Sequence, residues 1–175
     1  MVYKTYIIIR NFISSATKKE LADILLVPFF ITIFIYFLVG SSLLSNESFL
    51  SNFNSLVIST ASILVSFGIA SLSAIISSSS PNIEAAQNFV TDRVDRNNKY
   101  INYYKLQILR NFFSLFILFG LLIFSIIMIF VSLPHRFMLY LYYFQIYLLL
   151  LSIYSQIFVI QSLYFLFVDN KKIFK

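Results

Sequence analysis

Four runs of apolar residues, none of which contains a charged side chain, divide the chain into blocks. They cover residues 24–44, 53–77, 112–133 and 137–168. Each run can cross a hydrocarbon layer of about 30 Å as a helix. Strands are not expected, because lipid cannot satisfy an open sheet edge and the runs lack the alternation of a barrel. The pattern predicts a single-domain, all-α integral membrane protein with four transmembrane helices.

The ends of two runs carry further information. Thr17 and Glu20 occupy the N-cap and third positions of a capping box, so the first helix is expected to begin near residue 18. The fourth run would measure about 48 Å as a helix, which exceeds the hydrocarbon thickness. That helix is therefore expected to tilt or to project beyond the membrane.

The overall composition supports a membrane protein. Hydrophobic residues make up 59% of the 175 residues and charged residues only 11%, with a mean hydropathy of +0.86. A soluble domain is about a quarter charged. The first expected partner of this chain is therefore the lipid bilayer, which its helices would cross several times.

The basic residues predict the orientation. Twelve of the thirteen Lys and Arg residues lie before the first run, between the second and third, or after the fourth; only Arg136 lies elsewhere. Because basic residues accumulate on the cytoplasmic side, both termini and residues 81–110 are expected in the cytoplasm. The same bias accounts for most of the net charge of +6. Direct binding of nucleic acid is therefore not expected.

Two of the runs carry polar stripes. In the second run, small residues recur at steps of three and four, which places them on one helix face. This serine stripe consists of Ser55, Ser59, Ser62, Ser66, Ala70, Ser73 and Ser77. The fourth run carries a shorter stripe of Gln145, Ser152 and Gln156.

Two interpretations of the stripes remain open at the level of sequence. Small residues allow helices to approach closely, so the stripes could form packing seams within or between subunits, with the second and fourth helices meeting through them. Alternatively, the second helix could line a polar path on the axis of an oligomer. Neutral hydroxyls would give such a pore little ion selectivity.

Residues 81–110 lie outside the apolar runs and are predicted to form a cytoplasmic helical connector. Ser80 and Pro81 fit the N-cap and first position of a helix. Oppositely charged residues recur four positions apart, as on a helix surface. The pairs are Asp92 with Arg96 and Asp95 with Lys99, and the expected break between two helices is Asn97-Asn98.

This connector is either a solvated linker or a docking surface for a cytoplasmic protein. Docking would depend on the varied charges that the segment exposes. The candidate docking residues are Asp92, Arg93, Asp95, Arg96, Lys99 and Lys105.

Residues suited to catalysis are scarce. The chain has no cysteine, its one histidine lies in the short turn before residue 137, and the four runs contain no ionisable Asp, Glu, His, Lys or Arg. A proton relay within the runs is therefore excluded, and the chain lacks a glycine-rich phosphate loop. An enzyme is not expected, nor is a catalytic, cofactor or metal site.

The architecture resembles the membrane subunits of Kiwa-type bacterial anti-phage systems. The resemblance is carried by the four spans and by residues 81–110, PNIEAAQNFVTDRVDRNNKYINYYKLQILR. It covers the whole chain but includes no diagnostic motif. The resemblance implies a homo-oligomer, a tetramer, in the bacterial inner membrane.

The same resemblance implies a sensor or scaffold subunit that detects infection and docks a cytoplasmic DNA-binding effector through residues 81–110. The alternative function is an oligomeric pore-forming effector that depolarises the membrane.

Overall fold

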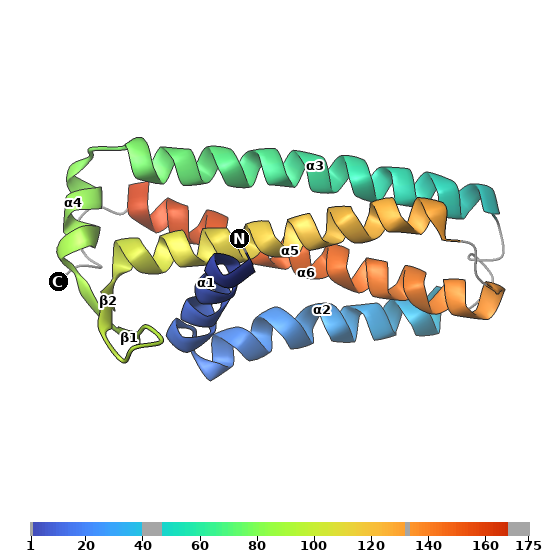
Figure 1. Ribbon diagram of the computed structural model, residues 1–175, viewed down its shortest axis with the longest axis horizontal. Coiled ribbons are helices and arrows are strands. Elements are labelled where there is room, and N and C mark those ends of the chain that lie inside the picture. Colours follow the sequence, from blue (N-terminus) through green and yellow to red (C-terminus); the bar gives the residue numbers. More distant parts are fainter. Residues whose placement is uncertain (1, 40–46, 132–133, 168–175) are drawn as a thin grey trace.

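The computed structural model of the chain describes residues 2–39, 47–131 and 134–167. Within these residues, four long helices run side by side as a bundle, and the shorter elements gather at one end of it (Figure 1). We call this end, which holds the hairpin, α4 and the junction of α1 with α2, the charged end. In chain order the elements are α1 (Val2–Ser15), α2 (Lys18–Val39), α3 (Glu47–Ser77), α4 (Pro81–Asn88), β1 (Val90–Val94), β2 (Tyr100–Asn102), α5 (Tyr103–Phe130) and α6 (His135–Phe167).

The four predicted spans correspond to α2, α3, α5 and α6. All four helices are long and apolar enough to cross a membrane. All four helices begin before the predicted limits of the apolar runs. The difference is largest for α5, which begins nine residues before residue 112. Residues 40–44, 132–133 and 168 of the predicted spans lie outside the described residues.

Helix α5 lies at the centre of the bundle and contacts α1, α3 and α6. Its buried positions recur at steps of four and three, the spacing of a helix that packs in a bundle. Apolar contacts with α3 fill the middle of the interface, where Leu118 and Leu121 meet Val57 and Ala61. The buried positions in register are Gln107, Asn111, Ser114, Leu118, Leu121, Ser125 and Met128.

Side chains of α5 and α6 pack closely against α3 at Gly68. A Cβ atom at this position would lie 2.7 Å from Cδ2 of Leu115 and 3.1 Å from Nε2 of Gln156. Glycine therefore permits the close approach, as small residues do at membrane helix interfaces.

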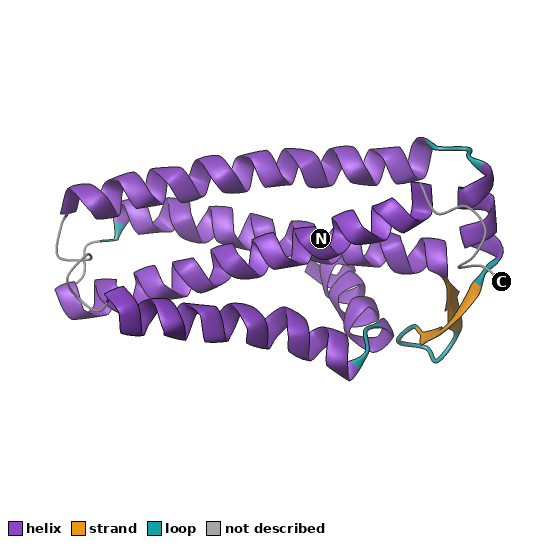
Figure 2. Ribbon diagram, turned by 180° about the vertical axis from the view of Figure 1, so that it is seen from behind, coloured by secondary structure: helices purple, strands orange, loops and turns teal. Residues whose placement is uncertain are grey.

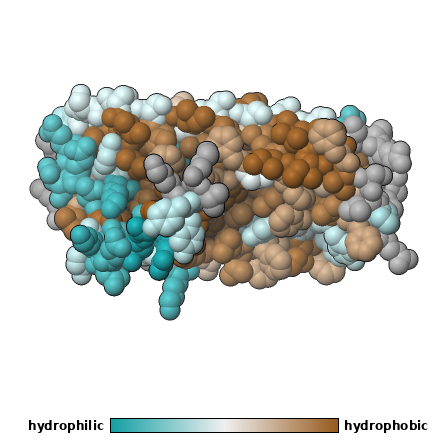
Figure 3. Space-filling model, in the orientation of Figure 1, coloured by the Kyte–Doolittle hydropathy of each residue, from teal (hydrophilic) through white to brown (hydrophobic). Residues whose placement is uncertain are grey.

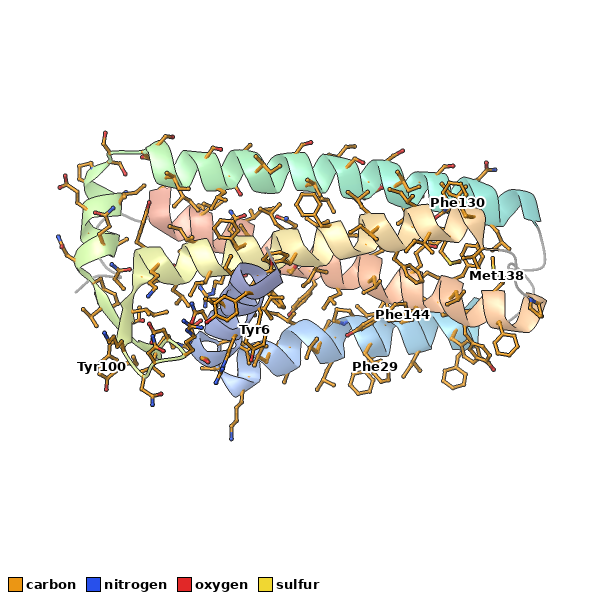
Figure 4. All side chains as sticks on the ribbon, viewed as in Figure 1. Tyr6, Phe29, Tyr100, Phe130, Met138 and Phe144 are labelled. Carbon is orange, nitrogen blue, oxygen red and sulfur yellow. The ribbon has the colours of Figure 1, made fainter. Side chains whose placement is uncertain are left out.

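The surface of the bundle is mainly apolar. Hydrophobic residues cover most of the long helices, whereas hydrophilic residues gather at the charged end (Figure 3). Exposed aromatic side chains such as Phe29, Phe144 and the 82% exposed Phe130 project from three different helices (Figure 4). A soluble monomer rarely exposes such a large apolar surface, whereas lipid would cover it.

Residues 81–110 do not form the predicted pair of helices. They form α4, an antiparallel hairpin of β1 and β2, and the first two turns of α5 (Figure 2). The predicted break between two helices at Asn97-Asn98 is wrong as to the elements it joins: these residues form the turn between β1 and β2, and Asn98 has a φ of 58°. Asparagine tolerates this left-handed conformation, and the β-branched residues of β1 favour a strand.

The charge pairs that suggested a helix therefore have another arrangement. Asp95 and Lys99 face each other across the turn, where the Asp95 N–H donates to the Lys99 carbonyl at 2.9 Å. Asp92 lies on β1, and Arg96 lies in the turn. Spacing of four residues could not distinguish a helix from this turn.

The N-terminal segment forms a helix that the sequence analysis did not predict. Helix α1 runs obliquely across α5, and Phe12 stacks on Phe113 with ring centroids 3.9 Å apart (Figures 1 and 2). Ile8 packs beside Ile101 of the hairpin and Leu106 of α5. Helix α1 thus joins the bundle to the hairpin.

Candidate functional site

The serine stripe lies on the outer face of α3. All seven of its positions are exposed, whereas Val57, Ala61 and Ser71 on the opposite side are buried. The expectation that α3 and α6 meet through their polar stripes is therefore wrong within one chain. The inward face of α3 is the face that carries Gly68. A larger side chain at this position would collide with Leu115 of α5.

The hydroxyl groups of the stripe bond to their own helix. Ser59 donates to the Ser55 carbonyl at 3.0 Å, Ser62 to Ile58 at 2.8 Å and Ser66 to Ser62 at 3.0 Å. These bonds leave a narrow surface with few protruding atoms. From Ser55 to Ser77 the stripe extends over about 33 Å of helix, close to the thickness of a hydrocarbon core. It forms part of the pale upper edge in Figure 3.

The stripe of α6 is buried in the bundle, and one of its members, Gln145, belongs to a hydrogen-bonded network. Nε2 of Gln145 donates to Oδ1 of Asn54 at 2.6 Å and to Oγ of Ser125 at 2.8 Å. Nδ2 of Asn54 donates to the Ser125 carbonyl at 3.1 Å. This network connects α3, α5 and α6 and confirms interhelical bonding of Gln145, with partners other than the serine stripe.

A second polar cluster lies nearer the charged end. Nδ2 of Asn111 donates to Oγ of Ser71 at 2.6 Å. The Ser114 and Ser155 hydroxyls lie 3.0 Å apart, and Ser152 donates to its own helix at the Leu148 carbonyl. The α5 members of the two networks, Ser125, Asn111 and Ser114, were not predicted from the sequence. Their four-and-three spacing on an otherwise apolar helix was the available signal.

Gln156 differs from Gln145 because both of its side-chain polar atoms are buried without a hydrogen-bond partner. A buried amide without partners costs about 1–3 kcal/mol. Methionine has a similar length and no such atoms. We expect Gln156→Met to raise the free energy of unfolding by about 1 kcal/mol.

Gln145→Met is the matched comparison, and we expect it to lower the free energy of unfolding by about 1–3 kcal/mol because Asn54 and Ser125 lose their partner. Denaturant titration of the detergent-solubilised protein measures both. If Gln156→Met and Gln145→Met changed the free energy of unfolding equally, the two glutamines would not differ in hydrogen bonding as the structure shows.

An ionic cluster joins the bundle to the hairpin. Nε of Arg110 donates to Oε1 of Glu20 at 2.9 Å, and Nη2 of Arg93 lies 3.9 Å from Oε2 of the same carboxylate. The Arg110 guanidinium also lies 5.1 Å from the centre of the Phe158 ring. Glu20 is buried. The cluster therefore links α2, α5, α6 and β1.

Glu20 also contributes to the start of α2. Its backbone N–H donates to Oγ1 of Thr17 at 3.0 Å, which confirms Thr17 as the predicted cap. Ser80 occupies the N-cap position of α4 with Pro81 behind it, but its side chain makes no cap hydrogen bond. The pairing of the Glu20 carboxylate with Arg93 and Arg110 was not predicted, because these arginines lie far from Glu20 in the chain.

The predicted docking residues separate into two groups. Arg93, Asp95 and Lys105 make contacts within the chain, since Nζ of Lys105 lies 3.5 Å from Oδ2 of Asp95. Asp92 and Lys99 are exposed, and Arg96 is partly exposed. The free surface of the hairpin is therefore smaller than the sequence analysis predicted.

Asp95 organises the hairpin turn. Its Oδ1 accepts the backbone N–H groups of Asn97 at 2.8 Å and of Lys99 at 3.1 Å. These two bonds, more than the nearby Lys105 ammonium, lower the pKa of the Asp95 carboxyl below its usual value. The carboxylate is thus charged at neutral pH and holds the turn.

The described residues contain no group of three His, Cys, Asp or Glu side chains that could hold a metal ion. Their chemistry suits binding: a small-residue stripe, two buried networks, and a hairpin with charged and aromatic side chains. Comparison of the chain with protein-family models, with curated proteins and with solved structures found no match.

Proposed function

We propose that the chain is an oligomeric membrane scaffold that docks a cytoplasmic protein at its charged end. Its role would be that of the sensor subunit of a bacterial anti-phage complex in the inner membrane. The observation that carries the docking proposal is the exposed part of the β1–β2 hairpin. The hairpin lies at one end of the bundle (Figure 1), the end where hydrophilic residues gather (Figure 3).

The base of the hairpin is fixed to the bundle. Ile101 is buried, and Nδ2 of Asn102 donates to the Gln87 carbonyl of α4 at 2.8 Å. The outer side chains of the hairpin remain accessible: Lys99 is exposed and Tyr100 is 71% exposed (Figure 4). A rigid base with an exposed tyrosine suits protein recognition, because tyrosine is enriched at binding hot spots.

The distribution of basic residues supports a cytoplasmic location for this surface. Arg93, Arg96, Lys99, Lys105 and Arg110 all lie at the charged end or in the first turns of α5. Positive residues favour the cytoplasmic side. A soluble effector would therefore reach the hairpin from the cytoplasm.

The serine stripe supports the oligomer. Its small side chains run along the outer face of α3 over about the thickness of a membrane, and their bonded hydroxyls permit close approach of a second helix. We propose that copies of α3 pack against one another along this stripe.

The ionic cluster offers a route for sensing. Glu20 joins α2 to Arg110 of α5 and to Arg93 of the hairpin. A change in helix tilt during infection would alter these distances and so move the docking surface. This coupling is part of the proposal. It is supported by the contacts of Glu20 with both the hairpin and the membrane-crossing helix α5.

Docking is tested with the soluble proteins encoded beside this chain, captured on the detergent-solubilised protein. We expect Tyr100→Ala to weaken capture about tenfold or more, because exposed hot-spot tyrosines contribute about 2 kcal/mol. Tyr6→Ala is the matched control, since Tyr6 is an exposed tyrosine on α1 (Figure 4). Equal capture by wild type and Tyr100→Ala would contradict docking at the hairpin.

The length of the serine stripe also favours a second function, a pore-forming effector with α3 on the channel axis. Expression of the chain alone distinguishes the two. A scaffold leaves the membrane potential unchanged without its partner, whereas a pore depolarises the cell.

A further inference from the structure

A cavity of about 250 Å³ lies between the hairpin and the start of α5. Thr91 and Arg93 of β1 line one side, and Tyr103, Leu106 and Arg110 of α5 line another. Two arginines from different elements therefore border one cavity. The proposed function uses the outer surface of the hairpin and leaves this cavity unassigned.

The two arginines at the cavity are both paired with one buried carboxylate. Arg93 and Arg110 share the single carboxylate of Glu20. Arg110 is bonded through Nε, while its Nη1 lies 3.5 Å from Oγ of Ser162. Among the described residues, the Arg93 guanidinium has only the 3.9 Å ion-pair contact with Glu20. Each guanidinium carries five N–H donors, so several remain for a ligand.

The start of α5 also favours an anion. Tyr103 is the first residue of α5, so the positive end of a long helix dipole lies beside the cavity. Asp92 also borders the cavity, and its carboxylate opposes an anion there. Because Asp92 is exposed, solvent and salt screen this charge.

We propose that this cavity binds a phosphoryl group, held by Arg93 and Arg110. Guanidinium groups match the geometry of phosphate oxygens with paired hydrogen bonds. Phe89, Tyr103 and Leu106 give the cavity an apolar part beside the arginines. The group belongs to a phospholipid headgroup or to a soluble phosphorylated molecule. Both sources are considered because the lining residues lie at the charged end, beside the start of the apolar helix α5.

Thermal unfolding of the full chain in a neutral detergent tests the proposal. The probes are dioctanoyl phosphatidylglycerol, dioctanoylglycerol, which lacks the phosphoryl group, and inorganic phosphate. We expect phosphatidylglycerol or phosphate to raise the unfolding midpoint and dioctanoylglycerol to leave it unchanged. A shift with the lipid alone assigns a headgroup, whereas a shift with phosphate assigns a soluble ligand.

Arg93→Gln is the test variant, because removal of the Arg93 guanidinium leaves the closer Arg110–Glu20 pair intact. For whichever phosphoryl probe raises the unfolding midpoint of the wild type, we expect Arg93→Gln to bind about tenfold more weakly, as for one lost charge-assisted hydrogen bond. Arg10→Gln removes the same charge from exposed α1 and should retain binding. The proposal is overturned if no phosphoryl probe shifts the midpoint, or if both variants weaken binding equally.

Discussion

Arg110→Met is expected to lower the free energy of unfolding by about 3 kcal/mol, because Glu20 would remain buried without its closest partner. Removing one member of a buried ion pair costs about 3–5 kcal/mol. We expect the lower end of this range, since Arg93 remains 3.9 Å from the same carboxylate. Denaturant titration in detergent measures the change.

The double variant Glu20→Met with Arg110→Met separates the lost pair from lost packing. Removal of both charges leaves no unpaired group, so the double variant should be more stable than Arg110→Met alone. A double variant that is less stable than either single variant would contradict a mainly ionic role.

Replacement of Ser59, Ser62 and Ser66 by leucine is expected to abolish the oligomer. These residues lie on one exposed face of α3, and leucine would hold a second helix away from the stripe. Because the face is exposed in one chain, the bundle itself should keep its stability. Mass measurement of the detergent complex reports the oligomeric state.

Replacement of the same three residues by alanine provides a sharp control. Their hydroxyls bond to carbonyls of α3, so alanine keeps the shape of the stripe. A packing seam should therefore survive Ser→Ala and fail with Ser→Leu. If the alanine variant dissociates as completely as the leucine variant, close packing of small residues does not explain the oligomer.

The long helices could be predicted from the sequence because apolar length is a local property. Runs such as 53–77 and 137–168 correspond closely to α3 and α6. Which side of α3 faces inward could not be predicted, because both sides carry small residues that suit helix packing. Gly68 marked the buried side, whereas the serine stripe suggested the other.

The charged segment was predicted less well for a related reason. Asp95 and Lys99 are four positions apart, a spacing that fits both a helix and the observed turn. The pairing of Glu20 with Arg110 depends on a contact across ninety residues, which a single sequence does not reveal.

The central claim is that the chain forms an oligomeric platform for a soluble partner, and the mass of the gently extracted complex tests it most directly. The chain should be expressed with its neighbouring genes and weighed after subtraction of the detergent. The account predicts several copies of the 20.4 kDa chain together with a second polypeptide. A single 20.4 kDa chain without a partner would contradict it.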